Sequence, residues 1–257
     1  MQIKGRYAVA LAIAFGLSGQ MSAEAAERRC NKARHVAGIE KPIPKLHDRI
    51  EQGDTIRIVA LGSSSTEGTP DIDKKDIYPA VMERMLAREV LNPVEIINRG
   101  KGGEQISHML ARLERDVIGV RPDLVVWQLG VNDVLAMDGV DAAIADMRIA
   151  LQRLRALQIP VVLVDLQVAP MVDGDKDTPT MQAAIAEAAK SEGVLHFHRY
   201  EVMKNLLSTQ EAKLDELVTG DGLHMTVLGH YCTGALLAKQ IAGGALTRLA
   251  MRPRPIE

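Results

Sequence analysis

The feature that most constrains the fold is an alternation of short apolar segments with longer segments of helical periodicity. The apolar segments are rich in β-branched residues, which is typical of buried strands. They cover residues 55–61, 94–98, 124–129, 161–165 and 194–197. The helical segments cover residues 77–91, 105–118, 140–157, 178–191 and 226–248. Strands that alternate with helices predict an α/β fold in which helices cover both faces of a parallel sheet.

The N-terminus has the pattern of a secretory signal peptide over residues 1–25. Lys4 and Arg6 precede a short apolar run, and Ala23-Glu24-Ala25 fits a cleavage site of the A-x-A type. The apolar run is too short to span a bilayer comfortably, so we expect no stable membrane anchor after cleavage. A retained N-terminal anchor is the alternative. The pattern predicts a secreted or periplasmic protein of a bacterium.

The segment that follows the signal peptide, residues 26–53, is polar and contains Pro42 and Pro44. We expect it to form an extended N-terminal strap, because a residue before proline favours extended backbone. No linker, repeat or low-complexity stretch divides the chain after it, so residues 54–257 are predicted to form one domain.

Composition narrows the function classes. The formal net charge is -2, whereas proteins that bind nucleic acids usually carry a basic excess, so we expect no nucleic-acid partner. Aromatic residues make up 3% of the chain, which disfavours stacking on bases or long sugar chains. The two cysteines, Cys30 and Cys232, are too few for a disulfide scaffold. An oxidising compartment permits a disulfide between them, which would tie the strap to the last helix.

Small or polar residues stand where three predicted strands end. The first strand runs into Gly62-Ser63-Ser64-Ser65-Thr66-Glu67-Gly68, and residues 100–103 and 130–133 follow two others. Asp221 and His224 precede the last helix. In an open parallel sheet such strand exits converge on one rim, where ligands bind. A serine, a histidine and an aspartate there would suit acyl transfer through a covalent intermediate, although a serine-rich turn or helix cap is the simpler reading of the first exit.

These four blocks, in this order, resemble those of the SGNH (GDSL-type) hydrolase family. The resemblance implies a flavodoxin-like three-layer α/β/α sandwich with a five-stranded parallel sheet. It also implies that Ser64 is the nucleophile, His224 the base and Asp221 the carboxylate that orients the base. The implied oxyanion donors are the backbone N–H groups of Ser64 and Gly103 and the side chain of Asn132. No metal or cofactor is implied.

One residue departs from the family pattern: Ser63 stands where the family usually has aspartate. The departure leaves the hydrogen bonding of the turn open, and it leaves Ser63 and Ser65 as alternative nucleophiles. The roles are chemically sound, since a serine hydroxyl attacks only when a neighbouring imidazole takes its proton. We also expect glycine at position 103 because a side chain there would crowd the approaching acyl group.

Four further residues have two readings each. His196 and His198 alternate on a predicted strand, so they share a face and could bind a metal, but ordinary packing explains them as well. Asp133 is expected to make structural hydrogen bonds, with a catalytic role as the alternative. His230, six residues after His224, is expected to be packed rather than catalytic.

The sequence therefore predicts an exported serine esterase that hydrolyses oxygen esters through an acyl-enzyme intermediate. Export points to acetyl or acyl groups on envelope carbohydrate or lipid as its substrate. The same residues would also suit an acyltransferase that passes the acyl group to a sugar hydroxyl. A catalytically silent ligand-binding protein of the same fold is the alternative from another class.

Overall fold

The computed structural model describes residues 22–38, 41–136 and 139–246. The predicted signal peptide lies outside these residues except at its end, where helix α1 (Ala23–Asn31) includes the expected cleavage site. None of the helices in the described ranges is long and apolar enough to cross a membrane.

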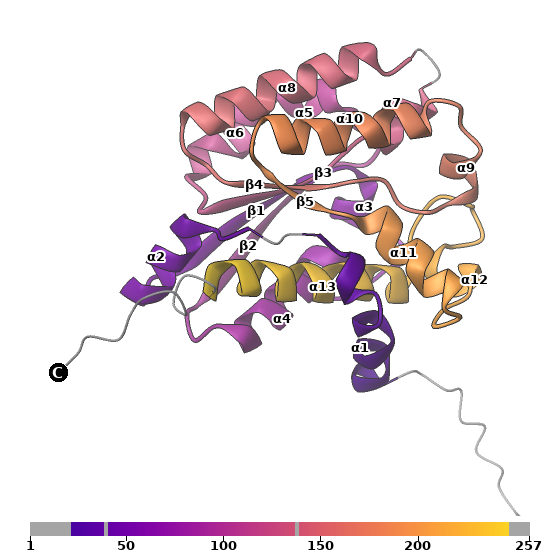
Figure 1. Ribbon diagram of the computed structural model, residues 1–257, viewed down its shortest axis with the longest axis horizontal. Coiled ribbons are helices and arrows are strands. Elements are labelled where there is room, and N and C mark those ends of the chain that lie inside the picture. The colour runs from indigo at the N-terminus through magenta and orange to yellow at the C-terminus, as the bar shows by residue number, and fades with distance from the viewer. Residues whose placement is uncertain (1–21, 39–40, 137–138, 247–257) are drawn as a thin grey trace, which may run out of the picture.

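Five parallel strands form the sheet at the centre of the molecule, in the order β2-β1-β3-β4-β5 (Figure 1). They are β1 (Ile56–Gly62), β2 (Val94–Gly100), β3 (Leu124–Gln128), β4 (Val161–Val164) and β5 (Leu195–Phe197). Each of the five apolar segments thus forms a strand, and β3 and β4 are buried along their whole length, as central parallel strands should be. From β1 the chain adds β2 on one side of the sheet and then crosses to add β3, β4 and β5 on the other side. The strand order therefore reverses between β1 and β3, and ligands bind at such switch points in α/β folds.

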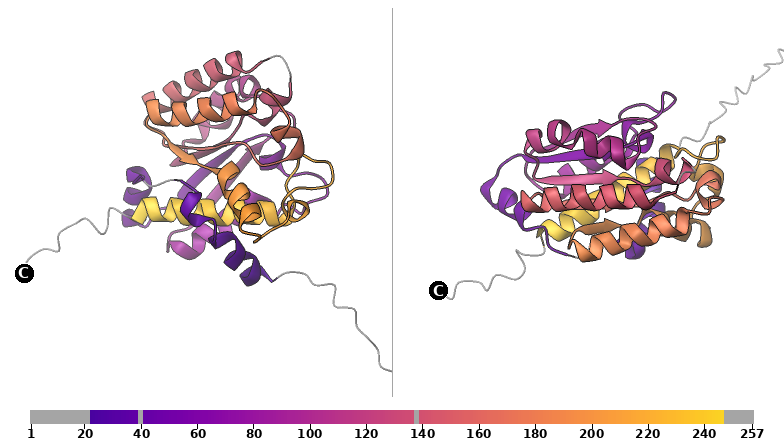
Figure 2. Two further views of the ribbon diagram at one scale, coloured as in Figure 1. Left: turned by 45° about the vertical axis from the view of Figure 1, so that its right-hand side comes forward. Right: turned by 90° about the horizontal axis from the view of Figure 1, so that it is seen from above.

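Helices cover both faces of the sheet, which makes the predicted three layers. One face carries α5 (Ile106–Ala111), α6 (Leu113–Asp116), α8 (Asp141–Ala156) and α10 (Thr178–Ser191), and the other carries α4 (Tyr78–Glu89) and α13 (Val227–Leu246), as Figures 1 and 2 show. Shorter helices follow strands or fill connections: α3 (Ser64–Glu67), α7 (Val131–Leu135), α9 (Pro170–Asp173), α11 (Arg199–Ser208) and α12 (Leu214–Leu217). The predicted α/β/α sandwich is confirmed.

The N-terminal segment is helical, so the predicted extended conformation of residues 26–53 is wrong. It contains α1, a short 3-10 helix (Arg34–Val36) and α2 (Pro44–Gln52). Ser22 caps α1 by accepting a hydrogen bond from the Ala25 N–H. Pro44 is the first residue of α2, a position where its fixed φ and missing N–H favour a helix rather than oppose it. The predicted disulfide is confirmed: Cys30 of α1 is bonded to Cys232 of α13.

The helix predicted over residues 105–118 is confirmed only in part, because the chain is helical over most of this range but breaks into α5, α6 and a 3-10 turn (Ile118–Val120). The first break falls at Arg112, whose φ of -109° and ψ of 7° leave the helical region. Its guanidinium turns inward and donates a hydrogen bond to the carbonyl of Arg99 at the end of β2. Helical periodicity in the sequence does not reveal such a break, since it depends on a partner from another element.

Candidate active site

Ser64 lies at the carboxyl end of β1, where the strand passes directly into α3. Among the three consecutive serines, Ser63 and Ser65 are each only 4% exposed, whereas Ser64 is more accessible. The Ser63 hydroxyl is already engaged, since it donates to the side-chain oxygen of Gln128 at 3.1 Å. The fold thus presents the middle serine, the one that the family resemblance selects.

A chain of hydrogen bonds joins Ser64 to the loop before α13. The Oγ atom of Ser64 lies 3.0 Å from Nε2 of His224, and Nδ1 of the same ring lies 2.6 Å from Oδ2 of Asp221. The side chains of His224 and Asp221 are 26% and 48% exposed, so the group lies at the surface of the rim. His224 therefore links Ser64 to Asp221 through two hydrogen-bond distances, although the two motifs lie far apart in the chain.

The surroundings of Asp221 keep its carboxylate ionised. Burial disfavours the charge, but hydrogen bonds from Thr219, His224 and backbone N–H groups outweigh that effect and hold the pKa of Asp221 well below its ordinary value. Oδ1 accepts the N–H groups of Leu223 and His224 at 2.8 and 3.0 Å, which leaves Oδ2 for the imidazole. This turn fixes the direction of the carboxylate towards His224.

Gln128, at the end of β3, forms hydrogen bonds with the turn that contains Ser63, the residue that stands where the family usually has aspartate. Its Oε1 atom accepts three hydrogen bonds, from the Ser63 N–H at 2.9 Å and from the hydroxyls of Ser63 and Thr66 at 3.1 Å each. The Thr66 hydroxyl also contacts the Tyr78 hydroxyl at 2.9 Å, and burial raises the pKa of Tyr78 to about 12. The turn is therefore held by a buried network of neutral side chains, although the aspartate that is usual in the family is absent.

The loop after β2 leaves one backbone donor without a partner. Within the part of the chain that the structure describes, the N–H groups of residues 100, 101, 102, 104 and 105 all donate to intramolecular acceptors, but no acceptor is found for Gly103. Gly103 has a φ of +76°, which favours glycine whatever the space around it. A Cβ atom there would meet no protein atom within 4 Å, so backbone conformation is a reason for glycine that the sequence did not reveal.

Asn132, in the exit of β3, lies against the same loop. Its Nδ2 group donates to the carbonyl of Glu104 at 2.8 Å, which uses one of its two N–H bonds. The Ser64 N–H, at the first position of α3, likewise has no acceptor among the described residues. The three donors that the family resemblance implies therefore come from three neighbouring strand exits.

Two of the residues with alternative readings have structural contacts. Asp133 is 3% exposed, and its Oδ1 accepts the Ile106 N–H at 3.0 Å, as expected. His230 is 1% exposed, and its Nδ1 accepts the Tyr78 N–H at 3.2 Å. Burial lowers the pKa of His230 to about 3, so the ring is neutral in the fold. The prediction that His230 is packed is confirmed.

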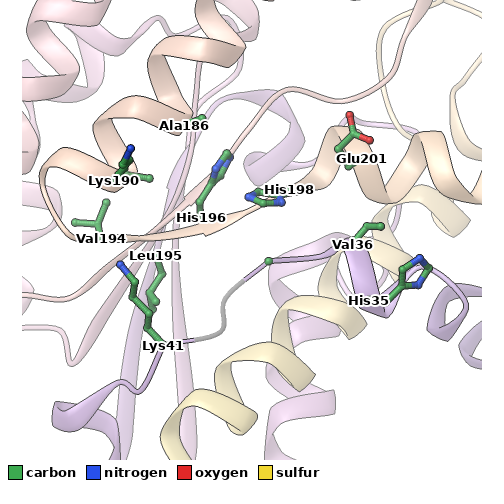
Figure 3. Close-up of a pocket in the computed structure, with 12 residues that line it drawn as sticks. His35, Val36, Lys41, Ala186, Lys190, Val194, Leu195, His196, His198 and Glu201 are labelled. Atoms are coloured by element: carbon green, nitrogen blue, oxygen red, sulfur yellow. The ribbon is translucent and has the colours of Figure 1, made fainter.

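His196 and His198 lie in a separate place, on a cavity of about 620 Å³ beside β5, which Figure 3 shows. Nε2 of His196 is 3.0 Å from the Asp165 carboxylate, and the two imidazole rings stack edge to face with centroids 4.2 Å apart. Neither histidine belongs to a group of three metal-ligating side chains in the described ranges. The one such group there is His47, Asp48 and Glu51 on α2.

The residues that sequence reasoning missed are those that support the loops: Gln128, Glu67, Glu104 and Arg112. Gln128 offered a signal, because it is a polar residue within an otherwise apolar strand. The other three are charged residues in polar segments, where such residues are common. Only their hydrogen bonds distinguish them.

The comparison with protein families supports the class that the sequence resembles, an SGNH/GDSL-type hydrolase. The model of the non-GDSL lipase-like family matches residues 29–247, and the chain belongs to that family. A search of curated proteins found no significant match.

Several solved structures share the fold. A two-domain esterase active on acetylated mannans, crystallised with mannopentaose, is 18% identical with a TM-score of 0.70, over 82% of this chain and 56% of the esterase. A catalytic mutant of an acetylxylan esterase from Geobacillus stearothermophilus is 19% identical, with a TM-score of 0.62, over 72% and 94%. A lipase/acylhydrolase from Enterococcus faecalis is 24% identical, with a TM-score of 0.62, over 73% and 96%.

Proposed function

We propose that the protein is an exported serine esterase that hydrolyses oxygen esters through an acyl-enzyme intermediate. The observation that carries the proposal is the hydrogen-bonded series from Asp221 through His224 to Ser64, with distances of 2.6 and 3.0 Å, on the ligand-binding rim of a hydrolase fold. Geometry of this kind lets an imidazole take a proton from the hydroxyl while a carboxylate holds the ring in the required tautomer.

In the proposed reaction, His224 accepts the Ser64 proton as Oγ attacks the ester carbonyl. The carbonyl oxygen becomes negative and receives hydrogen bonds from the N–H groups of Ser64 and Gly103 and from the Asn132 amide. His224 then gives its proton to the departing alcohol as the ester C–O bond breaks. His224 then takes a proton from water as the water attacks the acyl-enzyme, the bond between Ser64 Oγ and the acyl carbon breaks, and the carboxylic acid leaves as Ser64 regains a proton from His224.

The substrate class that we propose is acetylated or otherwise acylated carbohydrate of the cell envelope. Two structural neighbours bear names that describe esterases of acetylated polysaccharides, one active on acetylated mannans and one an acetylxylan esterase. The signal-like residues 1–25 and the disulfide between Cys30 and Cys232 favour a periplasmic or secreted location, because disulfides persist in oxidising compartments.

The test is hydrolysis of p-nitrophenyl acetate, butyrate and octanoate by the purified protein and by Ser64→Ala. We expect the variant to lose about 10⁴-fold or more of the turnover, since removing a triad nucleophile costs at least that much. Ser65→Ala, at the buried neighbouring serine, is the matched control and should remain active. The acetate-to-octanoate profile would separate an acetyl esterase from a lipase-like enzyme.

Activity that survives in Ser64→Ala would overturn the assignment of the nucleophile. If the unaltered protein neither hydrolyses these esters nor reacts with a fluorophosphonate, the silent binding protein becomes the better reading. Labelling without hydrolysis would favour the acyltransferase, and product analysis with a sugar acceptor would identify it.

A further inference from the structure

The loop that carries Gly103 is held on both sides of that residue. On one side, the Gly102 N–H donates to Oε2 of Glu67 at 2.6 Å, and Glu67 is the last residue of α3. On the other side, the carbonyl of Glu104 accepts from Asn132 at 2.8 Å. The Gly103 N–H between them has no acceptor among the described residues. A donor whose neighbours are all engaged is pre-organised, because it needs no rearrangement to meet a developing charge.

Arg112 connects this loop to the protein interior. Its side chain is 5% exposed and forms an ion pair with Glu104, with 2.7 Å between Nη2 and Oε2. Nη2 also donates to the Arg99 carbonyl at 2.8 Å, so one guanidinium contacts the loop where it begins and where it ends. A planar guanidinium is suited to such a role, since its donors point in fixed directions.

A second carboxylate completes the surroundings of Arg112. Nη1 donates to Oδ2 of Asp116 at 3.0 Å, one turn further along the chain. Hydrogen bonds from Arg115 and from Arg112, together with their positive charges, hold the pKa of Asp116 well below its ordinary value although burial opposes this. Two carboxylates therefore balance a buried cation, which is the condition under which a buried ion pair persists. The break between α5 and α6 at Arg112 brings the side chain to this place.

We propose that Arg112, acting through Glu104, is a positioning residue that aims the Gly103 N–H at the oxyanion of the ester reaction. The proposal rests on the proposed function of the same rim. Arg112 does not contact the ester carbonyl or the Ser64 hydroxyl in the proposed reaction. It fixes the ends of the loop, and Glu67 and Asn132 fix the residues on either side of the donor.

The test compares Arg112→Ala, Arg112→Lys and Glu104→Gln with Arg115→Ala as the matched control. Arg115 bonds to the same Asp116 at 2.6 Å, but its side chain is 70% exposed and forms no hydrogen bond or ion pair with the loop in the described structure. For Arg112→Ala we expect kcat for p-nitrophenyl acetate to fall about 10- to 100-fold with KM changed by less than about twofold, because a small misplacement of a transition-state donor costs rate rather than substrate binding.

The kcat values of Arg112→Lys and Glu104→Gln should lie between those of Arg112→Ala and the unaltered protein, since each variant keeps part of the contact between Arg112 and the loop. The pH profile of kcat/KM should keep its shape in all four variants, because none of them touches Asp221 or His224. Active sites are counted by fluorophosphonate titration, so that kcat refers to folded, reactive protein.

Three kinetic results would each overturn the proposal: Arg112→Ala with normal kcat per titrated site, equal losses in Arg112→Ala and Arg115→Ala, or a loss carried wholly by KM. Amide hydrogen exchange over residues 99–105 gives a readout that needs no esterase activity. Faster exchange there in Arg112→Ala but not in Arg115→Ala is expected, and equal exchange would reject the positioning role. An inactive, unlabelled parent protein would reject the proposed function alone, since the exchange experiment would still decide whether Arg112 holds the loop.

Discussion

Two aspartate–histidine pairs occur in the described part of the chain, and their surroundings differ. His224 and Asp221 approach to 2.6 Å on the rim, and His196 and Asp165 approach to 3.0 Å beside β5. The rim pair is the more exposed, with side-chain exposures of 26% and 48% against 13% and 5%. By the distance between carboxylate and imidazole alone, both would qualify as a base with its orienting acid.

The atoms beyond each imidazole separate the two pairs. Nε2 of His224 lies 3.0 Å from the Ser64 hydroxyl, whereas the imidazole of His196 packs against the ring of His198. Asp165 is also occupied by structural bonds: its Oδ1 accepts the Tyr200 N–H at 3.0 Å at the start of α11. An aspartate–histidine pair therefore indicates catalysis only where a nucleophile and free backbone donors lie next to it.

The comparison is tested most strongly by replacing the two aspartates in turn. Asp221→Asn should lower kcat about 10⁴-fold, because an amide in place of the carboxylate favours the wrong imidazole tautomer. Asp165→Asn should leave kcat within about twofold and lower the free energy of unfolding by about 1–3 kcal/mol, through the weakened buried hydrogen bonds. Ester hydrolysis and urea unfolding measure both effects. Equal kinetic losses in the two variants would remove the distinction between the pairs.

The second prediction concerns the donors that accompany the rim pair. Asn132→Ala should lower kcat about 10²- to 10³-fold, as expected for the loss of one oxyanion donor, with little change in KM. Asn31→Ala, on α1 and bonded to Lys239, is the control for loss of an asparagine side chain. Steady-state kinetics on p-nitrophenyl acetate measures the effect. An Asn132→Ala enzyme of normal kcat would show that the rim pair acts without this donor.

The last prediction concerns stability rather than turnover and involves His230, a histidine that forms no ion pair with a carboxylate in the described structure. Burial lowers the pKa of His230 in the folded protein to about 3, below the ordinary histidine value of about 6.5, so the unfolded chain binds the proton first as the pH falls. The contribution of the neutral His230 ring to the free energy of unfolding is therefore fully present above about pH 6.5. It is lost as the pH falls towards 3, with a slope of at most about 1.4 kcal/mol per pH unit.

His230→Gln should reduce that slope, and His35→Gln, at an exposed histidine, should not. Urea unfolding at several values between pH 7 and pH 4 measures the difference. A parent protein and a His230→Gln variant with the same slope would show that His230 does not carry the pH dependence.

Local patterns predicted most of the fold. All five strands form where the apolar runs stand, and α10 has the predicted bounds of Thr178–Ser191, because strand burial and helical periodicity are written in neighbouring residues. The errors occurred where a distant partner or a cap decided the conformation. Pro44 begins a helix instead of extending the chain, and Arg112 interrupts a helix to reach the end of β2.

Local sequence patterns alone predicted the sheet, and the resemblance of four motifs to a known family indicated the three residues of the hydrogen-bonded series. The residues that support these three became evident only from the folded chain. Gln128 contacts the serine turn across 65 positions in sequence because β3 lies beside β1, and Glu67 contacts Gly102 because β2 lies on the other side of β1. Such contacts follow from strand order, a global property that the residues of one segment do not encode.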